Sequence, residues 1–409
     1  MNLPGADEAR ARMLAAVGPL GAETVSLQEA NGRVLARPVR ATRAQPPFDA
    51  SSMDGWAVRR TDARDHAADL LIVGESAAGR PWPGRLEAGQ AVRISTGAPV
   101  PVGADAVVIQ EEALRTGDRV RIGPLHARHS YIRPAGCDFP AGAELLVPGA
   151  RLTPWSLALA AASGRDVLEI ARRPRLAILT TGDELAAAGG EAGAHQIFDS
   201  AGPALAAVAG ALGAEVSVLR WVGDSVASIL GAVDGLAADF LVTIGGASVG
   251  DHDLIKPALR ERGAELAVDG IAVRPGKPTW FGRLADGRLV LGLPGNPVSA
   301  LVCAELFLRP LLGRLQGAED GAVFTPVRAG APVPRNGGRE HFLRGRLSVD
   351  ADGVLTARVA SDQDSSLVSV LSRSNALIRR PANAPEAGTG ERVEAALLGP
   401  LGTESDNDG

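Results

Sequence analysis

Several loops combine glycine, acidic and hydroxyl residues in patterns that suit the binding of phosphate groups and a divalent cation. Residues 245–253 read Gly-Gly-Ala-Ser-Val-Gly-Asp-His-Asp, directly after an apolar run that ends at Ile244. Glycines without a Cβ let successive backbone N–H groups converge on an anion, and a following helix presents its positive end to the same point. The same residues also fit an ordinary strand-to-helix turn with Asp251 or Asp253 as N-cap, so the pattern leaves both interpretations open.

Two further loops also follow apolar runs. Residues 294–299 read Pro-Gly-Asn-Pro-Val-Ser, in which Asn296 is a natural N-cap and Pro297 suits the first position of a helix. Residues 180–185 read Thr-Thr-Gly-Asp-Glu-Leu, whose adjacent carboxylates are hard oxygen ligands of the kind that Mg²⁺ prefers. Simple helix capping in the first loop, and acids that complement a helix dipole in the second, are the alternatives.

Almost all of the basic residues are arginine, and lysine is rare. Of the 42 basic residues, only Lys256 and Lys277 are Lys. Arg274 and Lys277 flank Pro275-Gly276, a pair typical of a sharp turn, so both cations can be aimed at one anion. A surface turn with basic residues would look the same, but the scarcity of Lys favours a specific use for the compact ammonium group.

The segment from residue 46 to 138 contains similar loops. Residues 48–58 read Phe-Asp-Ala-Ser-Ser-Met-Asp-Gly-Trp-Ala-Val, where a plain hairpin would show regular alternation. We therefore expect a shaped loop around Asp54, with a long turn at its Asp-Gly pair as the alternative. Thr96 and Asp138 lie in comparable Gly- and Pro-containing loops.

Apolar periodicity predicts the elements that must position these loops. Short runs separated by Gly and Pro predict a β-rich region up to about residue 137. Residues 174–314 alternate strands and helices, which is typical of a doubly wound α/β domain whose ligands bind beyond the carboxyl ends of its strands. The short strands after residue 316 predict a compact β domain. The expected strands of the α/β domain are 175–182, 215–222, 239–244 and 288–293, and the expected helices of the chain are 5–17, 151–168, 203–212, 225–236, 253–263 and 297–312.

Length and composition exclude several classes of protein. A chain of 409 residues predicts more than one domain, and a net charge of -5 argues against a broad nucleic-acid surface. No uninterrupted apolar run approaches the roughly 20 residues of a membrane span, and the start carries Asp7 and Glu8 with no secretory pattern. Two cysteines cannot form a disulfide framework. We expect a cytoplasmic protein that binds neither nucleic acid nor membranes.

Taken in order, the loops resemble those of the MoeA-type molybdopterin molybdenumtransferases, which are related to the E domain of gephyrin. The similarity extends across nearly the whole chain. The segments that carry it most specifically are residues 48–58, 96–101, 181–185, 245–250, 275–278 and 293–299.

The resemblance implies a multidomain α/β plus β architecture. It implies an elongated N-terminal domain (1–44 with 140–173), an inserted β-rich domain (45–139), a doubly wound α/β molybdopterin-binding domain (174–318) and a C-terminal β barrel (319–400). The polar and acidic residues at the end predict a disordered tail (401–409). The resemblance also implies a homodimer whose active site joins the α/β domain of one chain to the inserted domain of the other. Transient contact with a molybdopterin adenylyltransferase is a further implication.

The implied reaction takes molybdopterin adenylate and molybdate as substrates, uses Mg²⁺ as cofactor, and releases AMP as molybdenum enters the dithiolene. By matching position, the resemblance implies catalytic roles for Asp54, Asp138, Glu184, Lys277 and Asp253, and metal binding by Glu184, Asp224 and Asp253. The substrate-binding positions that it implies are Thr96, Thr181, Gly182, Gly245, Gly246, Ser248, Gly250, Arg274, Pro294, Gly295, Asn296, Pro297 and Ser365.

The chain departs from the family pattern at several of these loops. Ala201 stands where Asn is usual, Ile244 where Ser is usual, Arg274 where Lys is common, Trp56 where Tyr is usual, and Asp364 where Gly is usual. These exchanges keep a second hypothesis open, in which a catalytically weakened paralogue binds molybdopterin or acts as a scaffold. A third, adenylyl transfer from ATP to molybdopterin, is less favoured because it would need only the α/β domain.

Overall fold

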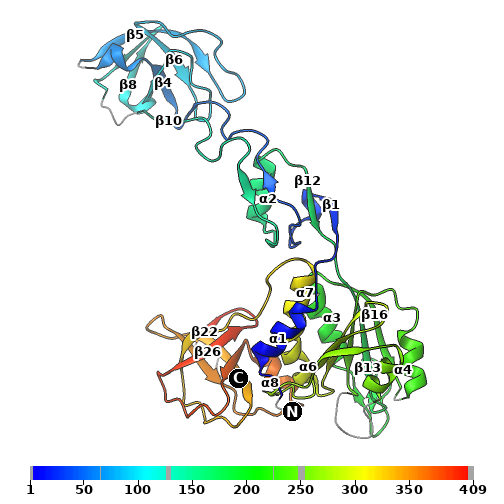
Figure 1. Ribbon diagram of the computed structural model, residues 1–409. Helices are drawn as coiled ribbons and strands as arrows, with labels where there is room; N and C mark the ends of the chain where they lie inside the picture. Colours follow the sequence, from blue (N-terminus) through cyan, green and yellow to red (C-terminus); the bar gives the residue numbers. More distant parts are fainter. Residues whose placement is uncertain (1–2, 65, 126–129, 224, 247–253, 404–409) are drawn as a thin grey trace. The chain divides into compact units, whose positions relative to one another are not determined.

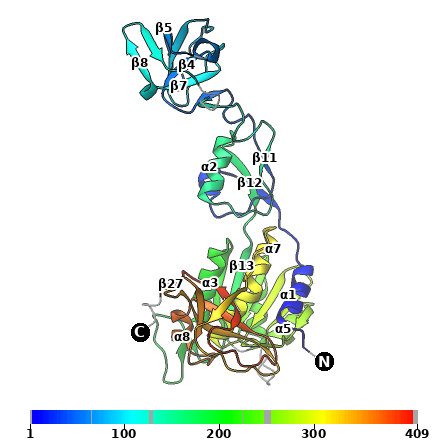
Figure 2. The same cartoon turned by 90° about the vertical axis from the view of Figure 1, so that its left-hand side faces the viewer.

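The computed structural model describes residues 3–64, 66–125, 130–223, 225–246 and 254–403. The chain divides into two compact units (Figures 1 and 2). The first unit contains residues 1–23, 32–36 and 170–409, and the second contains residues 24–31 and 37–169. Within the described ranges, no helix has both the length and the apolar character required to cross a membrane.

A six-stranded sheet organises the second unit, which confirms the expected β-rich fold. Trp56 and Val58 pack on one face of the sheet, and Ala57 packs on the other, as expected when successive side chains of a strand point to opposite faces. In spatial order the strands are β7 (Ala106–Ile109), β4 (Gly55–Val58), β6 (Gln90–Ile94), β5 (Ala68–Ser76), β9 (Arg119–Ile122) and β8 (Ala113–Thr116). This unit also contains two separate two-stranded sheets. One pairs β3 (Ala50–Ser51) with β10 (Ile132–Arg133), and the other pairs β2 (Val39–Arg40) with β11 (Glu144–Leu146).

Helix α2 (Pro154–Ala162) is shorter than the helix predicted for residues 151–168. Thr153 caps its start by accepting a hydrogen bond from the backbone N–H of Ser156, and Pro154 occupies the first turn. Gly164 then adopts a φ of +86°, a conformation that ends a helix. The prediction of a helix is wrong beyond Gly164, because strand β12 (Val167–Ala171) follows. Its partner strand β1 (Ala22–Ser26) was not predicted.

The first unit is built on a six-stranded sheet. Its first four strands in spatial order are parallel and confirm the four predicted strands. The last two join the sheet by antiparallel pairing and were not predicted. The order is β16 (Glu215–Val222), β13 (Arg175–Thr181), β17 (Phe240–Ile244), β21 (Leu289–Leu293), β20 (Trp280–Arg283) and β18 (Glu265–Asp269).

Helices cover both faces of this sheet, as a doubly wound fold requires (Figure 1). Alternate residues of β13 serve the two faces: Leu176 and Ile178 pack into one core, and Ala177 and Leu179 into the other. The first core takes α1 (Ala6–Ala15), α3 (Ala201–Ala211), α6 (Pro297–Cys303) and α7 (Arg309–Leu315); the second takes α4 (Val226–Val233) and α5 (Ile255–Glu261).

The single helix predicted for residues 297–312 is interrupted. Residues Ala304–Leu308 form a π-helical turn between α6 and α7. Pro310 has no backbone N–H to donate to the preceding turn, which favours such a local change in hydrogen bonding.

The C-terminal strands close into a five-stranded barrel, which confirms the predicted fold. Strand β23 pairs with both β24 and β25, so no edge remains between them. The barrel runs through β23 (Glu340–Val349), β24 (Leu355–Val359), β22 (Thr325–Ala329), β26 (Arg392–Leu397) and β25 (Ala376–Arg380), with helix α8 (Val368–Arg373) before β25. The tail predicted from residue 401 is wrong at its start, because β27 (Gly402–Thr403) pairs with β23; residues 404–409 lie outside the described ranges.

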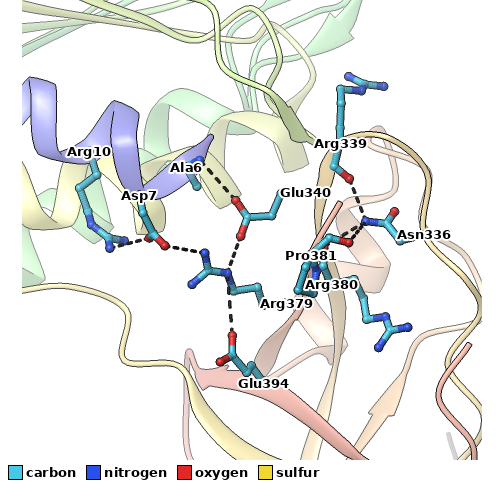
Figure 3. Close-up of polar contacts among 10 residues, drawn as sticks. All are labelled: Ala6, Asp7, Arg10, Asn336, Arg339, Glu340, Arg379, Arg380, Pro381 and Glu394. Atoms are coloured by element: carbon cyan, nitrogen blue, oxygen red, sulfur yellow. Dashed lines mark hydrogen bonds and ion pairs between the residues drawn. The ribbon is translucent and has the colours of Figure 1, made fainter. Parts of the chain in front are cut away.

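A partly buried ionic network joins α1 to the barrel (Figure 3). Arg379 forms ion pairs with Asp7, at 2.6 Å, and with Glu340, whose side chain is only 11% exposed. The backbone N–H of Ala6 donates to the other carboxylate oxygen of Glu340 at 3.3 Å. Partial burial works to raise the pKa of Asp7, but the hydrogen bond and charge of Arg379 outweigh it, so the pKa lies below its ordinary value of 3.8.

Replacing Arg379 should therefore destabilise this unit. Arg379→Met leaves the Glu340 carboxylate buried without its cation, at a cost of about 2 kcal/mol in the free energy of unfolding measured by urea denaturation. Arg10→Met, which removes only an exposed partner of Asp7, is the control and should cost less than about 1 kcal/mol. Because the folded pKa of Asp7 is lowered, its contribution is present above pH 3.8 and is lost as the pH falls further. Equal stability of the two variants would contradict the network.

Candidate functional site

A cavity of about 760 Å³ lies at the carboxyl ends of the parallel strands in the first unit. The loops after β13, β17 and β21 all line it. The residues from the sequence-predicted set that line this cavity are Thr181, Gly182, Glu184, Gly245, Gly246, Pro294, Gly295, Asn296 and Pro297. The three loops singled out in the sequence therefore meet at one place.

Strand order explains why the cavity opens there. After β13 the chain forms β16 on one side, and then returns to form β17 on the other side of β13. The connections that leave the carboxyl ends of β13 and β17 therefore run to opposite sides of the sheet. A crevice between diverging connections is the usual ligand position in such folds.

Gly182 and Glu184 form a tight turn at the end of β13. The carbonyl of Gly182 accepts a hydrogen bond from the N–H of Leu185 at 3.1 Å. Gly182 has a φ of +146°, and a Cβ at this position would lie 2.7 Å from both carboxylate oxygens of Glu184. Only glycine allows this conformation while the carboxylate occupies that space.

The loop after β17 approaches the same turn closely. A Cβ on Gly245 would lie 2.5 Å from the carbonyl oxygen of Thr181, and one on Gly246 would lie 2.8 Å from the side chain of Ile255. Both glycines have positive φ, at +92° and +56°. The predicted residues Ser248, Gly250 and Asp253 follow in this loop and lie outside the described residues, as does Asp224.

Asn296 makes a contact that differs from simple capping. Although it occupies the N-cap position of α6, its side chain makes no capping hydrogen bond. Its Nδ2 donates to Ser365 Oγ at 2.7 Å, and the carbonyl of Ser365 accepts from the N–H of Val298 at 3.3 Å. Ser365 is thus bonded to the wall of the cavity, which its neighbour Ser366 lines directly.

A cluster of basic side chains lies where the short strand β19 (Val273–Arg274) pairs with β23. Arg274 is opposite His341, and Arg344 lies farther along β23 with its side chain almost fully buried. Burial and the charges of Arg274, Arg344 and Arg339 lower the pKa of His341 to about 4. Burial is also the main cause of the lowered pKa of Arg344, whose Nε has no hydrogen-bond partner among the described residues.

Lys277 and Lys256 have different environments. Lys277 is exposed, and the residues on either side of it, Gly276 and Pro278, line the cavity. Lys256 forms an ion pair with Asp269 at 2.7 Å. Lys256 therefore has a structural role as the partner of Asp269. Of the two lysines, Lys277 is the one whose neighbours line the cavity.

Asp54 and Thr96 come together in the second unit. One carboxylate oxygen of Asp54 accepts hydrogen bonds from the Thr96 N–H at 2.6 Å and from the Thr96 hydroxyl at 3.0 Å. These bonds, with a smaller effect of the Arg93 charge, lower the pKa of Asp54. Asp138 is also exposed in this unit, and its N–H donates to the carbonyl of Gln45.

The donor set for a divalent cation is only partly within the described residues. Glu184 and Asp199 both line the cavity, and Asp199 also accepts a hydrogen bond from the N–H of Gly202 at 2.9 Å. No group of three His, Cys, Asp or Glu side chains suited to a metal occurs in the part of the chain that the structure describes. Two hard carboxylates beside a cavity nevertheless fit Mg²⁺, which commonly retains waters and bridges to substrate phosphates.

Several residues that the sequence reasoning did not select also belong here. Ile197 and Phe198 line the cavity and are about half exposed, and His341 and Arg344 form the core of the basic cluster. The available signal for Arg344 was its place directly after Phe342 and Leu343 in a predicted strand.

Comparisons with known proteins agree with this architecture. Family models match as the MoeA N-terminal region, domains I and II, over residues 5–164; as a probable molybdopterin binding domain over residues 177–314; and as the MoeA C-terminal region, domain IV, over residues 326–398. Two curated relatives are named molybdopterin molybdenumtransferase. One from Nostoc sp. is 36% identical, covering 91% of this chain and 87% of its own, and one from Haemophilus influenzae is 34% identical, covering 95% and 96%.

A solved structure shows the same fold over nearly the whole chain. The molybdopterin biosynthesis MoeA protein of Pyrococcus horikoshii superposes with a TM-score of 0.82 at 29% identity, covering 98% of this chain and 100% of the other. With the matches above, this similarity shows that the chain belongs to the MoeA family of molybdopterin molybdenumtransferases.

Proposed function

We propose that this transferase inserts molybdenum from molybdate into adenylated molybdopterin, uses Mg²⁺, and releases AMP. The observation that carries the proposal is the convergence of three loops on one cavity, which Glu184 and Asp199 line and to which Gly276 and Pro278, on either side of Lys277, also contribute. An adenylated, phosphorylated ligand and an oxyanion need both kinds of charge.

The glycine-lined loops suit the phosphate groups of such a substrate. Gly182, Gly245, Gly246 and Gly295 all line the cavity, so bare backbone borders a large part of it. Backbone without side chains can approach phosphate oxygens closely and donate N–H groups to them.

Glu184 and Asp199, together with Asp224 and Asp253 if these take the positions that the family resemblance implies, would hold Mg²⁺. When bound, the ion would offset the negative charge of the phosphate oxygens and stabilise the departure of AMP. The role of the protein is then to orient the adenylate against these carboxylates and to keep a positioned water near the phosphoanhydride bond.

The basic cluster supports molybdate binding. Burial is the main cause of the lowered pKa of His341, and the positive charges of Arg274, Arg344 and Arg339 add to the effect. These three charges create a positive potential at His341. The same potential favours a dianion. Arg274 and Lys277, which flank the Pro275-Gly276 turn, are therefore the proposed contacts of molybdate on the exposed side of the cluster.

Glu184→Gln tests the carboxylate side. The exchange keeps the size of the side chain and removes its charge, so AMP release from molybdopterin adenylate with molybdate and Mg²⁺ should slow by about 10- to 100-fold. Glu191→Gln, an exposed exchange in the same segment between β13 and α3, is the matched control and should behave as wild type. Unchanged AMP release in Glu184→Gln would remove Glu184 from the site. Tight adenylate binding by the wild type without AMP release would instead favour the hypothesis of a binding or scaffold protein.

Arg274→Gln tests the basic side. Because Arg274 is exposed, its loss should leave stability nearly unchanged while the KM for molybdate rises by about 10-fold. Arg335→Gln removes another exposed guanidinium from the same unit and should leave that KM unchanged. Parallel behaviour of the two variants would assign molybdate to a different site.

We further propose the homodimer that the family resemblance implies, in which Asp54 of one chain completes the site around Glu184 of its partner. Asp54→Ala and Glu184→Ala should each be inactive alone. When the two are unfolded, mixed and refolded together, about half of the dimers are mixed and each has one intact site, so about a quarter of wild-type AMP release should return. A mixture that stays inactive, although light scattering shows dimers, would contradict the shared site.

A further inference from the structure

Trp221 is placed in a way that core packing does not explain. It lies on β16, the edge strand of the sheet, opposite Thr180 of β13, and its side chain is 52% exposed. A large aromatic side chain on an exposed edge strand contributes little to a hydrophobic core. Its indole N–H instead donates a hydrogen bond to the carbonyl oxygen of Gly182 at 2.8 Å.

The carbonyl that receives this bond belongs to the turn that carries Glu184. Gly182 O accepts from both the indole of Trp221 and the N–H of Leu185, so two donors fix the orientation of one peptide group. The carboxylate of Glu184 lies directly against Gly182, where a Cβ would approach its oxygens to 2.7 Å. A rotation of the Gly182 peptide would therefore shift the backbone against which this carboxylate lies.

The other side-chain contacts to this turn are longer. Gln196 Nε2 lies 3.4 Å from the carbonyl of Asp183 and 3.5 Å from that of Leu185. Among the described residues, the indole bond is thus the shortest side-chain hydrogen bond to the backbone of residues 182–185. The turn depends on Trp221 more than on Gln196.

We propose that Trp221 is a positioning residue of this enzyme, whose indole N–H holds the Gly182 carbonyl and thereby the Glu184 carboxylate in the cavity. The inference rests on the proposed function only for its effect on ligands. The effect on the backbone turn is independent of what the cavity binds, so the two can be tested apart.

Two exchanges separate the donor from the bulk of the ring. Trp221→Phe retains an aromatic side chain and removes the N–H. Trp221→Gln removes the ring and places an amide N–H the same number of bonds from Cα. Leu219→Ala, on the same strand and similarly exposed, is the control for general damage to the strand.

The first measurement is hydrogen exchange of the Leu185 amide, which donates to the same Gly182 carbonyl. Exchange should be about five-fold faster in Trp221→Phe than in wild type, since one hydrogen bond to the turn is lost. Trp221→Gln should recover much of the protection, and Leu219→Ala should match wild type. Wild-type exchange in Trp221→Phe, or equally fast exchange in the Phe and Gln variants, would overturn the proposal.

The second measurement is the Mg²⁺ concentration that supports half-maximal AMP release. It should rise by about five-fold or more in Trp221→Phe, while the KM for molybdate stays the same, because the proposed molybdate contacts Arg274 and Lys277 belong to a different segment from this turn. Faster exchange with an unchanged Mg²⁺ requirement would overturn the link to Glu184. If the wild type released no AMP, the proposed function would fail, whereas the exchange result would still decide whether Trp221 holds the turn.

Discussion

The close approach of two backbone segments is the constraint on which the candidate site depends. Strands β13 and β17 are neighbours, and their loops come so near that any Cβ on Gly245 would meet the carbonyl of Thr181. Any other residue at Gly245 would force the loops apart and would also need an unfavourable positive φ. The divergence of the two connections opens the crevice, and the glycines leave its walls as bare backbone.

Acidic and basic side chains near this crevice come from different segments of the chain. Glu184 and Asp199 belong to segments that follow β13 and line the crevice, whereas the basic residues Arg274 and Lys277 flank the turn whose Gly276 lines it. Elsewhere in the same unit, Arg379 with Glu340 and Lys256 with Asp269 neutralise each other as ion pairs. Burial is the main cause of the lowered pKa of His341, and the charges of Arg274, Arg344 and Arg339 lower it further, to about 4.

Sequence periodicity predicted the elements that have strong local signals. Three of the four parallel strands, β13, β17 and β21, are mostly apolar runs, and β16 was predicted with the bounds that the structure has. Strands β18 and β20 were missed because charged or glycine residues interrupt or border their apolar residues. Their antiparallel pairing with each other and with β21 is not recorded within either segment. The second half of the helix expected for residues 151–168 was wrong because Gly164 ends α2, and the following residues form a strand.

By itself, the sequence determined the family, the order of elements, and the glycine, acidic and hydroxyl loops at strand ends, because these depend on local patterns and on fixed backbone requirements. Only the tertiary structure decided which distant side chains meet. It placed Ser365 on Asn296, His341 beside Arg274, and the indole of Trp221 on the carbonyl of Gly182. Such contacts depend on strand order and on how elements pack across the sheet, and no pattern within one short segment records them.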